Sequence, residues 1–385
     1  MKHPIDVTEI LNSQLESKLV DNCRKFKEEV PYYSKDYKYS NNLTKEGAWT
    51  GGFWAGLFWL LYKKSKDKEL KRCAKLYDKV FAERQYDTTT HDLGFLFMPS
   101  KVTEYRITGN QEARNQSLQA ARSLLTRYNQ SGGFVQAWGD MDDSDGSGKV
   151  IIDTVMNLPL LFWAHKETGN SEFIRIAKSH LRSTQKNLVR EDGSTYHMFL
   201  FDPSTGEPLK GTTLQGYSED SCWTRGQAWA IYGFTLAHCI AGEHSYLDTA
   251  KKAADYFIDH QPSDRIVPWD FQVTENDVES YSRDSSASAI ASSGLYELAK
   301  VVNGAKATQY RQEARKILKE LANQCFVRND NREKEGLLTK GCYFKPRNKG
   351  VNEHMVWGDY FFLESTMKYI NPSWAPCWYP QPNLV

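Results

Sequence analysis

One carboxylic acid lies in an unusually apolar stretch of the sequence. Asp153 is the only charged residue between Val150 and Ala164. Burying an ionised carboxylate without a partner costs free energy, so a group in such surroundings has a raised pKa and can carry a proton near neutral pH. The pattern therefore predicts acid–base chemistry at Asp153. The simpler alternative is a helix N-cap, since Thr154 and a further apolar run follow.

A second carboxylic acid, Asp92, belongs to the short motif His91–Phe95, which follows three threonines. Either Asp92 or a threonine could merely cap a helix. Pairs of carboxyl groups are, however, the usual equipment of enzymes that act on sugars. If Asp92 shares a cavity with Asp153, its negative charge raises the pKa of Asp153 further.

A third motif, Trp223–Trp229, combines aromatic rings with an arginine. Arg225 and Trp229 are four residues apart, so on a helix they would share one face. An arginine fork suits a carboxylate or a sulfate, and the alternative is a cation–π pair in the core. His197 lies in a polar loop, where simple exposure is the alternative to a role in binding.

We expect neither a metal nor an organic cofactor. The acidic stretch Asp140–Gly146 resembles a calcium loop only loosely, because its glycine is out of register and no glutamate closes it. The seven cysteines are scattered and include no CxxC pair, which favours reduced thiols over a zinc cluster. The sequence also lacks the P-loop, HExxH and GxSxG motifs.

Helical hairpins must position these residues. A period close to 3.6 recurs along the chain, as in Tyr310, Ala314, Ile317, Leu318 and Leu321. Glycine-containing turns, which typically end helices, fall at Gly109, Gly169, Gly242 and Gly304. Their spacing of 60 to 73 residues is near one sixth of the 385-residue chain. We predict an all-α (α/α)6 barrel of six hairpins in one domain, residues 1–385; a plain bundle or an open solenoid would also give helix pairs.

The polar segments between hairpins would gather at one rim of such a barrel and carry its function. They comprise residues 129–149, 191–221, 261–285 and 329–353. Aromatic residues make up 13% of the chain. They serve either as large core side chains or as platforms on which sugar rings stack.

The balance of charge excludes several classes of partner. Lys plus Arg is 49 and Asp plus Glu is 48, so nothing suggests binding to nucleic acid or to an anionic membrane. No apolar stretch approaches the length of a membrane span, and the N-terminal residues include no apolar core of signal-peptide length. We expect a cytoplasmic protein, or a periplasmic one if a leader has been removed, that is a monomer or a weak homo-oligomer.

A series of short motifs between residues 49 and 364 gives the chain a family resemblance. In order, they are Trp49–Trp54, His91–Phe95, Trp138–Gly139, Asp153–Leu160, Asp192–His197, Gln215–Gly216, Trp223–Trp229, Arg283–Ala287 and Trp357–Tyr360. Each motif alone is weak, but the ordered set resembles the unsaturated glucuronyl hydrolases of glycoside hydrolase family 88. The resemblance implies an (α/α)6 barrel with its pocket at one rim.

The resemblance also implies roles for individual residues. Asp153 would be the general acid and base, and Asp92 would be a second essential carboxylate that holds sugar hydroxyls. The positions that would line the site of an unsaturated oligosaccharide, typically a disaccharide, are Trp49, Phe53, His91, Trp138, His197, Gln215, Trp223, Arg225 and Trp229.

The implied reaction is hydration of a C4=C5 vinyl ether in a 4,5-unsaturated uronic acid. Asp153 would protonate C4, and its carboxylate would then accept a proton from the water that attacks C5. The resulting hemiketal opens and releases the neighbouring sugar. No metal or organic cofactor is required.

The chain departs from part of the family in its C-terminal loop. Some members have a Ser-x-x-Ser-x-Lys pattern there that favours sulfated substrates. The comparable stretch here, Phe344–Gly350, lacks the serines but contains Lys345, Arg347 and Lys349. We predict that this loop, Lys349 in particular, contacts a sulfate or another anion on the neighbouring sugar; the alternative is a solvated basic loop.

Three other functions remain open on the sequence alone. An unsaturated rhamnogalacturonyl hydrolase would share the fold and the chemistry but act on pectin fragments. A sugar 2-epimerase on a similar helical toroid would need histidine acid–base pairs. A carbohydrate-binding protein would keep the aromatic site without turnover.

Overall fold

The computed structural model describes residues 4–141, 147–277, 279–328, 331 and 333–379. Within these residues the fold is built from helices. The α-helices are α1 (Ser13–Phe26), α2 (Gly51–Ser65), α3 (Lys68–Val80), α4 (Leu93–Phe97), α5 (Thr103–Thr108), α6 (Gln111–Leu125), α7 (Pro159–Thr168), α8 (Ser171–Asn187), α9 (Thr224–Ala241), α10 (His244–His260), α11 (Ser285–Val301), α12 (Gly304–Gln324) and α13 (Val356–Ile370). Short helical turns are η1 (Val7–Glu9), η2 (Tyr39–Asn41), η3 (Ala82–Tyr86), the π-helix η4 (Met98–Val102), η5 (Ile152–Met156) and η6 (Lys345–Arg347).

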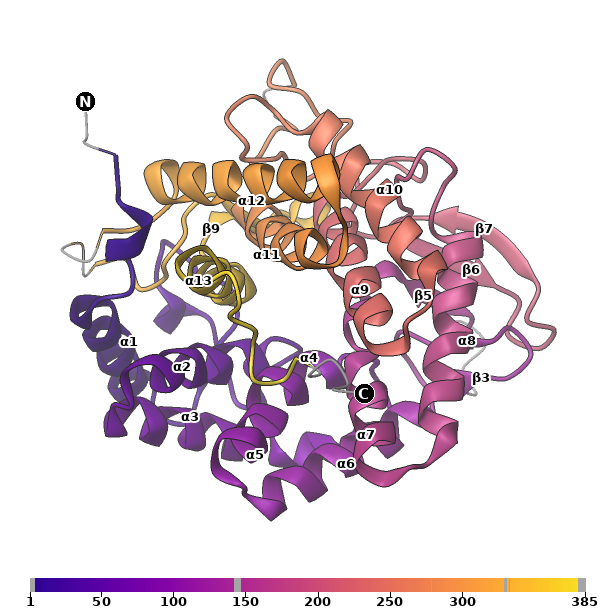
Figure 1. Cartoon of the computed structure of the whole chain (residues 1–385), viewed down its shortest axis with the longest axis horizontal. Helices are drawn as coiled ribbons and strands as arrows, with labels where there is room; N and C mark the ends of the chain where they lie inside the picture. Colours follow the sequence, from indigo (N-terminus) through magenta and orange to yellow (C-terminus); the bar gives the residue numbers. More distant parts are fainter. Residues whose placement is uncertain (1–3, 142–146, 278, 329–330, 332, 380–385) are drawn as a thin grey trace.

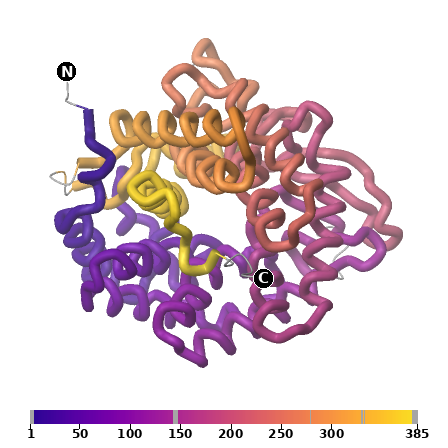
Figure 2. Tube along the Cα trace, viewed as in Figure 1, coloured from indigo at the N-terminus to yellow at the C-terminus, as the bar shows by residue number. Residues whose placement is uncertain are grey.

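The helices form a closed double ring. A π-turn, η4, joins α4 to α5, so the two make one interrupted helix; Pro99, which has no N–H to donate, lies in this turn. In the inner ring α2 contacts α4, α4 contacts α7, and the contacts continue through α9, α11 and α13 back to α2. Figures 1 and 2 show the chain running once around this ring, so that the last helix returns beside the first inner one. Closure distinguishes the fold from an open solenoid, and the predicted (α/α)6 barrel is confirmed.

Hydrophobic patterning separates the inner helices from the outer ones. Every residue from Gly51 to Leu61 of α2 is buried, as is every residue from Thr224 to Ala237 of α9. Outer helices bury a single stripe, such as Tyr310, Ala314, Ile317, Leu318 and Leu321 on α12. A helix that is apolar on all sides must be surrounded by protein, whereas an amphipathic helix can cover it.

Three of the four glycine turns are as expected, and one is not. Gly109, Gly169 and Gly242 follow α5, α7 and α9 in the left-handed conformation. The prediction was wrong for Gly304, which begins α12. There α11 ends at Val301, and the extended Val302 follows it.

Short antiparallel strands occupy the segments between hairpins. They are β1 (Val30–Pro31) with β2 (Leu43–Thr44), β3 (Tyr128–Asn129) with β4 (Phe134–Val135), β5 (Lys149–Ile151) with β6 (Met198–Phe201) and β7 (Pro208–Thr212), and β8 (Gly341–Phe344) with β9 (Lys349–Glu353). The pairing of Ile151 with Met198 matters for function. It places the segment after β5, with Asp153, next to the segment before β6, with His197.

All the inner helices begin at the same end of the barrel. Trp49, which precedes α2, lies with its ring centroid 5.5 Å from Phe95 of α4 and 4.8 Å from Trp357 of α13. Trp229 of α9 lies 5.0 Å from the same Phe95. Helix N-termini carry partial positive charge, so this end favours anions.

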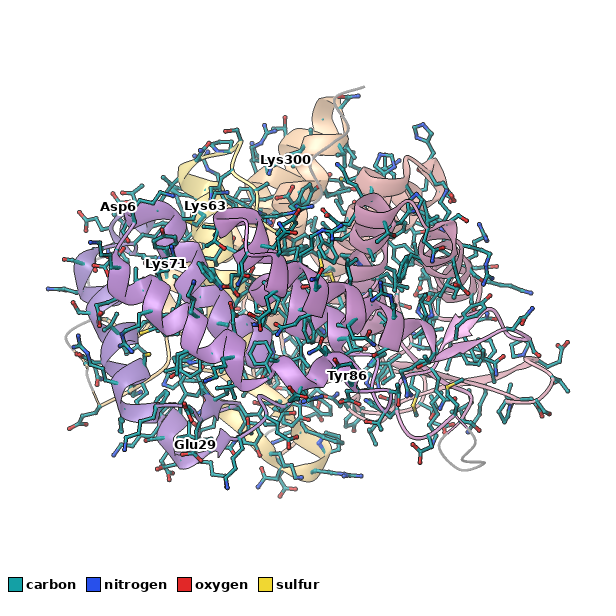
Figure 3. All side chains as sticks on the ribbon, turned by 90° about the horizontal axis from the view of Figure 1, so that it is seen from below. Asp6, Glu29, Lys63, Lys71, Tyr86 and Lys300 are labelled. Atoms are coloured by element: carbon teal, nitrogen blue, oxygen red, sulfur yellow. The ribbon has the colours of Figure 1, made fainter. Side chains whose placement is uncertain are left out.

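The opposite end is closed by the segment after α13. The amines of Lys63 and Lys300 donate to the carbonyls of Ala375 and Trp374, and the Arg106 guanidinium donates to that of Cys377. A cavity of about 830 Å³ lies there, lined partly by the ends of α9 and α11. Figure 3 shows Lys63 and Lys300 on one side of the molecule and Tyr86, a few residues before Asp92, on the other.

The main hydrophobic core includes residues from Val7 to Tyr379, and a small second cluster consists of Ala137, Ile151 and Met198. We therefore propose that residues 1–385 form one domain, as the sequence predicts. All seven cysteines are free thiols. No described helix has the length and the apolar character needed to cross a membrane.

Candidate active site

Close backbone packing brings Asp92 and Asp153 together. Asp92 immediately precedes α4, and Asp153 lies in η5, just before α7. Gly94 lies directly against Asn157: a Cβ added to Gly94 would be 2.3 Å from the Cα atom of Asn157. The Asn157 side chain also accepts a hydrogen bond from the Phe95 N–H at 2.7 Å. Only a residue without a side chain allows the two segments to approach so closely.

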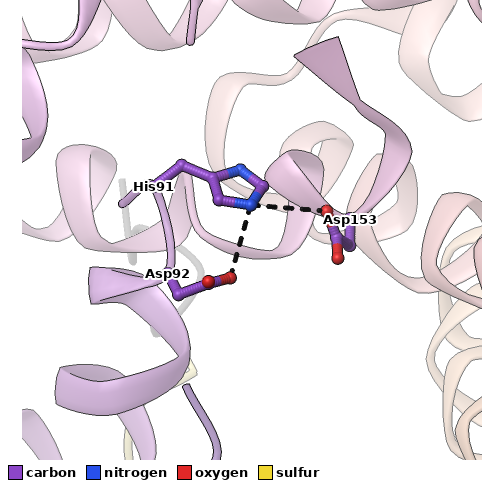
Figure 4. A group of neighbouring side chains, drawn as sticks. All are labelled: His91, Asp92 and Asp153. Atoms are coloured by element: carbon purple, nitrogen blue, oxygen red, sulfur yellow. Dashed lines mark ion pairs between the residues drawn. The ribbon is translucent and has the colours of Figure 1, made fainter. Parts of the chain in front are cut away.

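Figure 4 shows the resulting cluster of His91, Asp92 and Asp153. The Nε2 atom of His91 lies 3.4 Å from Oδ1 of Asp92 and 3.7 Å from Oδ1 of Asp153. On the other side of the ring, Nδ1 lies 2.6 Å from the Thr154 hydroxyl oxygen. Because Nε2 faces two acceptors, we place the ring proton there, and Nδ1 then accepts from Thr154. The predicted proximity of the two acids is confirmed.

Burial sets the protonation states of the two acids. It raises the pKa of Asp153 well above its ordinary value; the charge of Asp92 raises it further, and the Arg225 guanidinium opposes both effects. Burial also raises the pKa of Asp92 to about 6, against the opposing effects of a hydrogen bond from Thr90 and of nearby arginines. The raised pKa favours the protonated form of Asp153, whereas a pKa of about 6 leaves Asp92 largely a carboxylate near neutral pH.

His91 is a neutral spacer between them. Burial lowers its pKa to about 3, and the charge of Arg127 lowers it too. The imidazole therefore takes up no proton at neutral pH. Its main-chain N–H donates to the Ala137 carbonyl at 3.0 Å, and its ring meets that of Trp138 edge-on with centroids 6.2 Å apart.

One oxygen of Asp153 has no hydrogen-bond partner among the described residues. This atom, Oδ1, is buried, while 15% of the side chain is exposed. An unsatisfied buried polar atom is costly, so it needs an explanation. A carboxylic acid that keeps its proton available for a bound molecule supplies one.

The same three side chains include possible metal ligands. Their ligand atoms, one from each residue, lie within 4.8 Å of one another. Metal ligands must be deprotonated, however, and the raised pKa of Asp153 favours its protonated form. The expectation of no metal stays a prediction. Part of the acidic stretch weighed above for calcium, residues 142–146, lies outside the described residues.

His197 and Trp223 form the wall next to Asp153. The Ile152 N–H donates to the His197 carbonyl at 3.1 Å. Nδ1 of His197 accepts from the Leu214 N–H at 2.9 Å, which leaves its proton on Nε2, a buried atom without a partner. Burial lowers the pKa of His197 to about 3. The ring meets that of Trp223 edge-on, with centroids 4.7 Å apart, and presents a neutral N–H donor.

The Arg225 fork is already occupied by the protein. Nη1 donates to Oδ2 of Asp284 at 2.6 Å and to the Cys342 carbonyl at 2.6 Å. Nη2 donates to the Gln215 side-chain oxygen at 2.8 Å and to the Tyr343 carbonyl at 2.7 Å. Only 1% of the residue is exposed. The arginine therefore acts on the site chiefly through its charge, and direct contact with a substrate anion stays a prediction.

Aromatic residues surround Arg225 in a way that the helical spacing did not indicate. Its guanidinium lies 4.3 Å from the ring centroid of Trp223 and 5.3 Å from that of Trp357. Trp229, the residue expected to share its face, is buried and packs on Phe95 and Phe361 instead.

Of the remaining predicted aromatic residues, some line the site and others are buried beneath it. Trp49 and Trp138 are half-buried, and the Trp49 indole N–H donates to the Tyr32 hydroxyl at 2.7 Å. Phe53 is buried beneath Trp49 and contacts it edge-on. Phe53 and Trp229 therefore support the site from below, whereas Trp49 and Trp138 can meet a ligand.

Several residues of the site escaped prediction. Thr154 orients His91, and Tyr32 and Tyr343 pack at an angle against each other and against Trp357. Trp357 and Asp284 belong to motifs that carried the family resemblance, so a signal for them existed. Tyr32 lies in an irregular segment before α2, where neither periodicity nor a motif singles it out.

Lys349 is exposed at the start of β9. The β8–β9 hairpin that bears it also bears Tyr343, whose carbonyl accepts from Arg225. The basic loop is thus connected to the site by the backbone. Its contact with a substrate anion stays a prediction.

Comparison with known proteins agrees with this geometry. The family model of glycosyl hydrolase family 88 matches residues 22–370. The unsaturated chondroitin disaccharide hydrolase of Streptococcus pneumoniae is 38% identical over 362 residues, which cover 92% of this chain and 89% of that protein. The crystal structure of the unsaturated glucuronyl hydrolase of Bacillus sp. GL1 superposes with a TM-score of 0.91 at 34% identity, covering 98% of this chain and 100% of that one.

A third comparison includes a bound sugar. A mutant unsaturated glucuronyl hydrolase from Streptococcus agalactiae in complex with dGlcA-GalNAc6S superposes with a TM-score of 0.82 at 33% identity, covering 98% of this chain and 95% of that one. Sequence, fold and cluster point the same way, and the chain belongs to glycosyl hydrolase family 88.

Proposed function

We propose that this chain is an unsaturated glucuronyl hydrolase, which removes the 4,5-unsaturated uronic acid from the non-reducing end of glycosaminoglycan-type oligosaccharides. The observation that carries the proposal is the pair of acids: Asp153, with a buried unpartnered oxygen and a pKa that burial raises well above its ordinary value, lies beside Asp92, whose pKa is about 6. Such a pair, whose protonation states differ because their environments differ, can divide acid and base roles.

The proposed reaction begins with transfer of the Asp153 proton to C4 of the sugar. The C4=C5 double bond supplies the electron pair, and positive charge develops at C5 and the ring oxygen. Water then attacks C5, and the Asp153 carboxylate takes one of its protons. Asp153 is thereby restored, and one water has been added to the sugar.

The product of that addition is a hemiketal at C5. Its hydroxyl loses a proton as the C5 carbonyl forms and the bond from C5 to the ring oxygen breaks. The ring oxygen, now a hydroxyl on C1, forms a hemiacetal that collapses and releases the neighbouring sugar. The chain thus breaks a glycosidic bond without displacement at C1.

The other residues hold the substrate and shape the charge around it. In our proposal Asp92 accepts hydrogen bonds from sugar hydroxyls, and neutral His91 and His197 donate N–H groups. The Arg225 charge and the N-terminal ends of the inner helices attract the uronate carboxylate. Trp49, Trp138 and Trp223 provide flat surfaces for the planar part of the ring, with Gln215 among the polar groups at its edge.

The substrate class rests on two arguments. The relatives in the comparison are named for chondroitin disaccharides and for glycosaminoglycan degradation. The basic β8–β9 loop also suits an anion on the neighbouring sugar. Testing disaccharides from chondroitin, hyaluronan, heparin and pectin, and following the loss of the ultraviolet absorbance of the conjugated double bond, separates this proposal from pectin hydrolysis. Turnover of the pectin product alone would contradict it.

The variant Asp153→Asn tests the assigned acid. It should lower kcat by about 10² to 10⁴-fold, the usual contribution of a general acid or base. The disaccharide should still bind, as calorimetry can show. The outcome against the assignment is a kcat close to that of the unaltered chain.

Lys349→Ala tests the basic loop. We expect it to weaken the preference for sulfated over unsulfated disaccharides, because it removes one exposed positive charge from the loop. Lys64→Ala, on the C-terminal turn of α2, removes an exposed charge at the other end of the barrel and serves as the matched control. An unchanged preference in Lys349→Ala would mean that the loop is merely solvated.

Two of the alternatives are less compatible with the site. A 2-epimerase needs histidines that gain and lose protons, but the pKa values of His91 and His197 are both lowered to about 3. A pure binding protein does not need a buried acid with an unpartnered oxygen. We further propose a cytoplasmic location and a monomeric or weakly associated state, which fractionation and light scattering can test.

A further inference from the structure

Asp284 connects four segments of the catalytic end of the barrel. It is fully buried and caps α11, where its Oδ1 accepts from the N–H and the hydroxyl of Ser286 at 3.1 and 2.6 Å. The same oxygen accepts from the Cys342 N–H of β8 at 3.3 Å, and Oδ2 accepts from Arg225 of α9 at 2.6 Å. The Ser286 hydroxyl accepts in turn from the indole N–H of Trp357 on α13 at 2.9 Å.

Arg225 has no freedom of its own in this arrangement. Both of its Nη atoms have protein acceptors, and its plane lies against Trp223 and Trp357. Asp284 is the only one of its four acceptors that carries a charge. A buried arginine that lost this partner would be left with an uncompensated charge, which is costly.

We propose that Asp284 is a positioning residue for the hydration step. It fixes the Arg225 guanidinium and, through Ser286, the Trp357 ring, and it offsets part of the positive charge that reaches Asp153. The inference rests on the proposed function but assigns Asp284 no contact with the substrate. Its role is to determine how strongly the positive charge of Arg225 favours loss of the catalytic proton from Asp153.

The charges near Asp153 determine the direction in which loss of the Asp284 charge should shift its deprotonation. Among the described residues, the charged and titratable groups that act on or contact Asp153 are Asp92 on the segment before α4, Arg225 on α9, and the neutral imidazole of His91. Removing the Asp284 charge leaves the field of Arg225 uncompensated, so Asp153 should lose its proton at lower pH. Removing the Arg225 charge should have the opposite effect.

The test is the alkaline limb of the pH profile of kcat/KM in Asp284→Asn, measured on an unsaturated disaccharide. We expect this limb to move to lower pH by about one unit, the effect of one nearby charge in a partly screened site. We also expect kcat to fall by about 10 to 100-fold, since a misplaced group costs rate rather than binding. In Arg225→Gln the limb should move to higher pH.

Glu297→Gln is the matched control. Glu297 is a buried carboxylate on the same helix, about 20 Å further along at ~1.5 Å per residue, and it pairs with the buried Lys368 at 3.0 Å. This variant should lower the melting temperature, as Asp284→Asn should, but leave the alkaline limb unmoved. A structural role for Asp284 alone would give the two variants the same behaviour.

An unmoved limb in folded Asp284→Asn would overturn the inference. If that variant does not fold, Arg225→Gln combined with Asp284→Asn removes both buried charges, and its limb should lie above that of the unaltered chain. A limb at the original position would then refute the charge balance. Failure of the proposed function looks different, because the unaltered chain would turn over no unsaturated disaccharide at all.

Discussion

Replacing Gly94 by alanine should push the two catalytic acids apart. The new Cβ would lie 2.3, 2.5 and 2.7 Å from the Cα, carbonyl oxygen and carbonyl carbon of Asn157. All three are backbone atoms, so no side-chain rotation can relieve the contact. Either α4 or the η5–α7 segment must move, and these are the segments that bear Asp92 and Asp153.

The size of the effect follows from the distances. Non-bonded carbon atoms rest about 3.5 to 4.0 Å apart, so the segments must separate by about 1 Å or more. A misplacement of about 1 Å in a catalytic group costs on the order of 10²-fold in rate. Overpacking of this kind also destabilises a protein by about 1 to 3 kcal/mol. We therefore expect Gly94→Ala to fold but to be about 10²-fold slower.

The assay compares kcat/KM on an unsaturated disaccharide with the free energy of unfolding in urea. Gly169→Ala is the control, because Gly169 has a φ of +72° and no atom within 4 Å of an added Cβ. It should cost stability through backbone strain, yet leave the rate unchanged, since it lies beyond the far end of α7. Full activity in Gly94→Ala would refute the reasoning that this contact sets the distance between the acids.

Three further predictions concern the charges of the site. The pH profile should be bell-shaped, falling below about pH 6 as Asp92 gains a proton and falling at high pH as Asp153 loses one, with limbs that belong to the coupled pair; a profile flat down to pH 4 would contradict the role of Asp92. Asp92→Asn should abolish turnover but raise the free energy of unfolding at pH 7 by about 1 to 3 kcal/mol. Folding raises the pKa of Asp92 from 3.8 to about 6, so the contribution of Asp92 to stability falls as pH rises through that interval. Equal stability of Asp92→Asn and the unaltered chain at pH 7 would argue that burial is not what raises this pKa. Prolonged dialysis against a chelator should leave kcat unchanged, and restoration of lost activity by a divalent cation would reveal a metal requirement.

Much of the architecture could be predicted because it depends on local patterns. The apolar run around Asp153 indicates burial, and burial raises the pKa of a carboxylic acid wherever the chain then goes. Repeated helix pairs and their spacing likewise indicate a six-hairpin barrel. Ring closure itself is not local: it depends on contact between α2 and α13, almost 300 residues apart in sequence.

What the sequence could not reveal depends on partners from distant segments. The spacing of Arg225 and Trp229 indicates a shared helix face, but Arg225 turns to Asp284 and β8 while Trp229 faces the core. Gly304 looks like the other helix-ending glycines, yet it begins a helix because Val302 already ends α11. Tyr32 joins the aromatic wall through contacts with residues from distant segments, among them Trp49 and Tyr343.

The contact between α2 and α13 also bears on how the chain is made. The apolar face that α2 offers to α13 is complete early in synthesis, but α13 leaves the ribosome almost 300 residues later. Until then the growing ring has an open, water-facing edge that can associate with other nascent chains. Joining such widely separated segments is also slow. Expression at low temperature, or with chaperones that cover apolar surface, should therefore raise the soluble yield more than any change to the catalytic end.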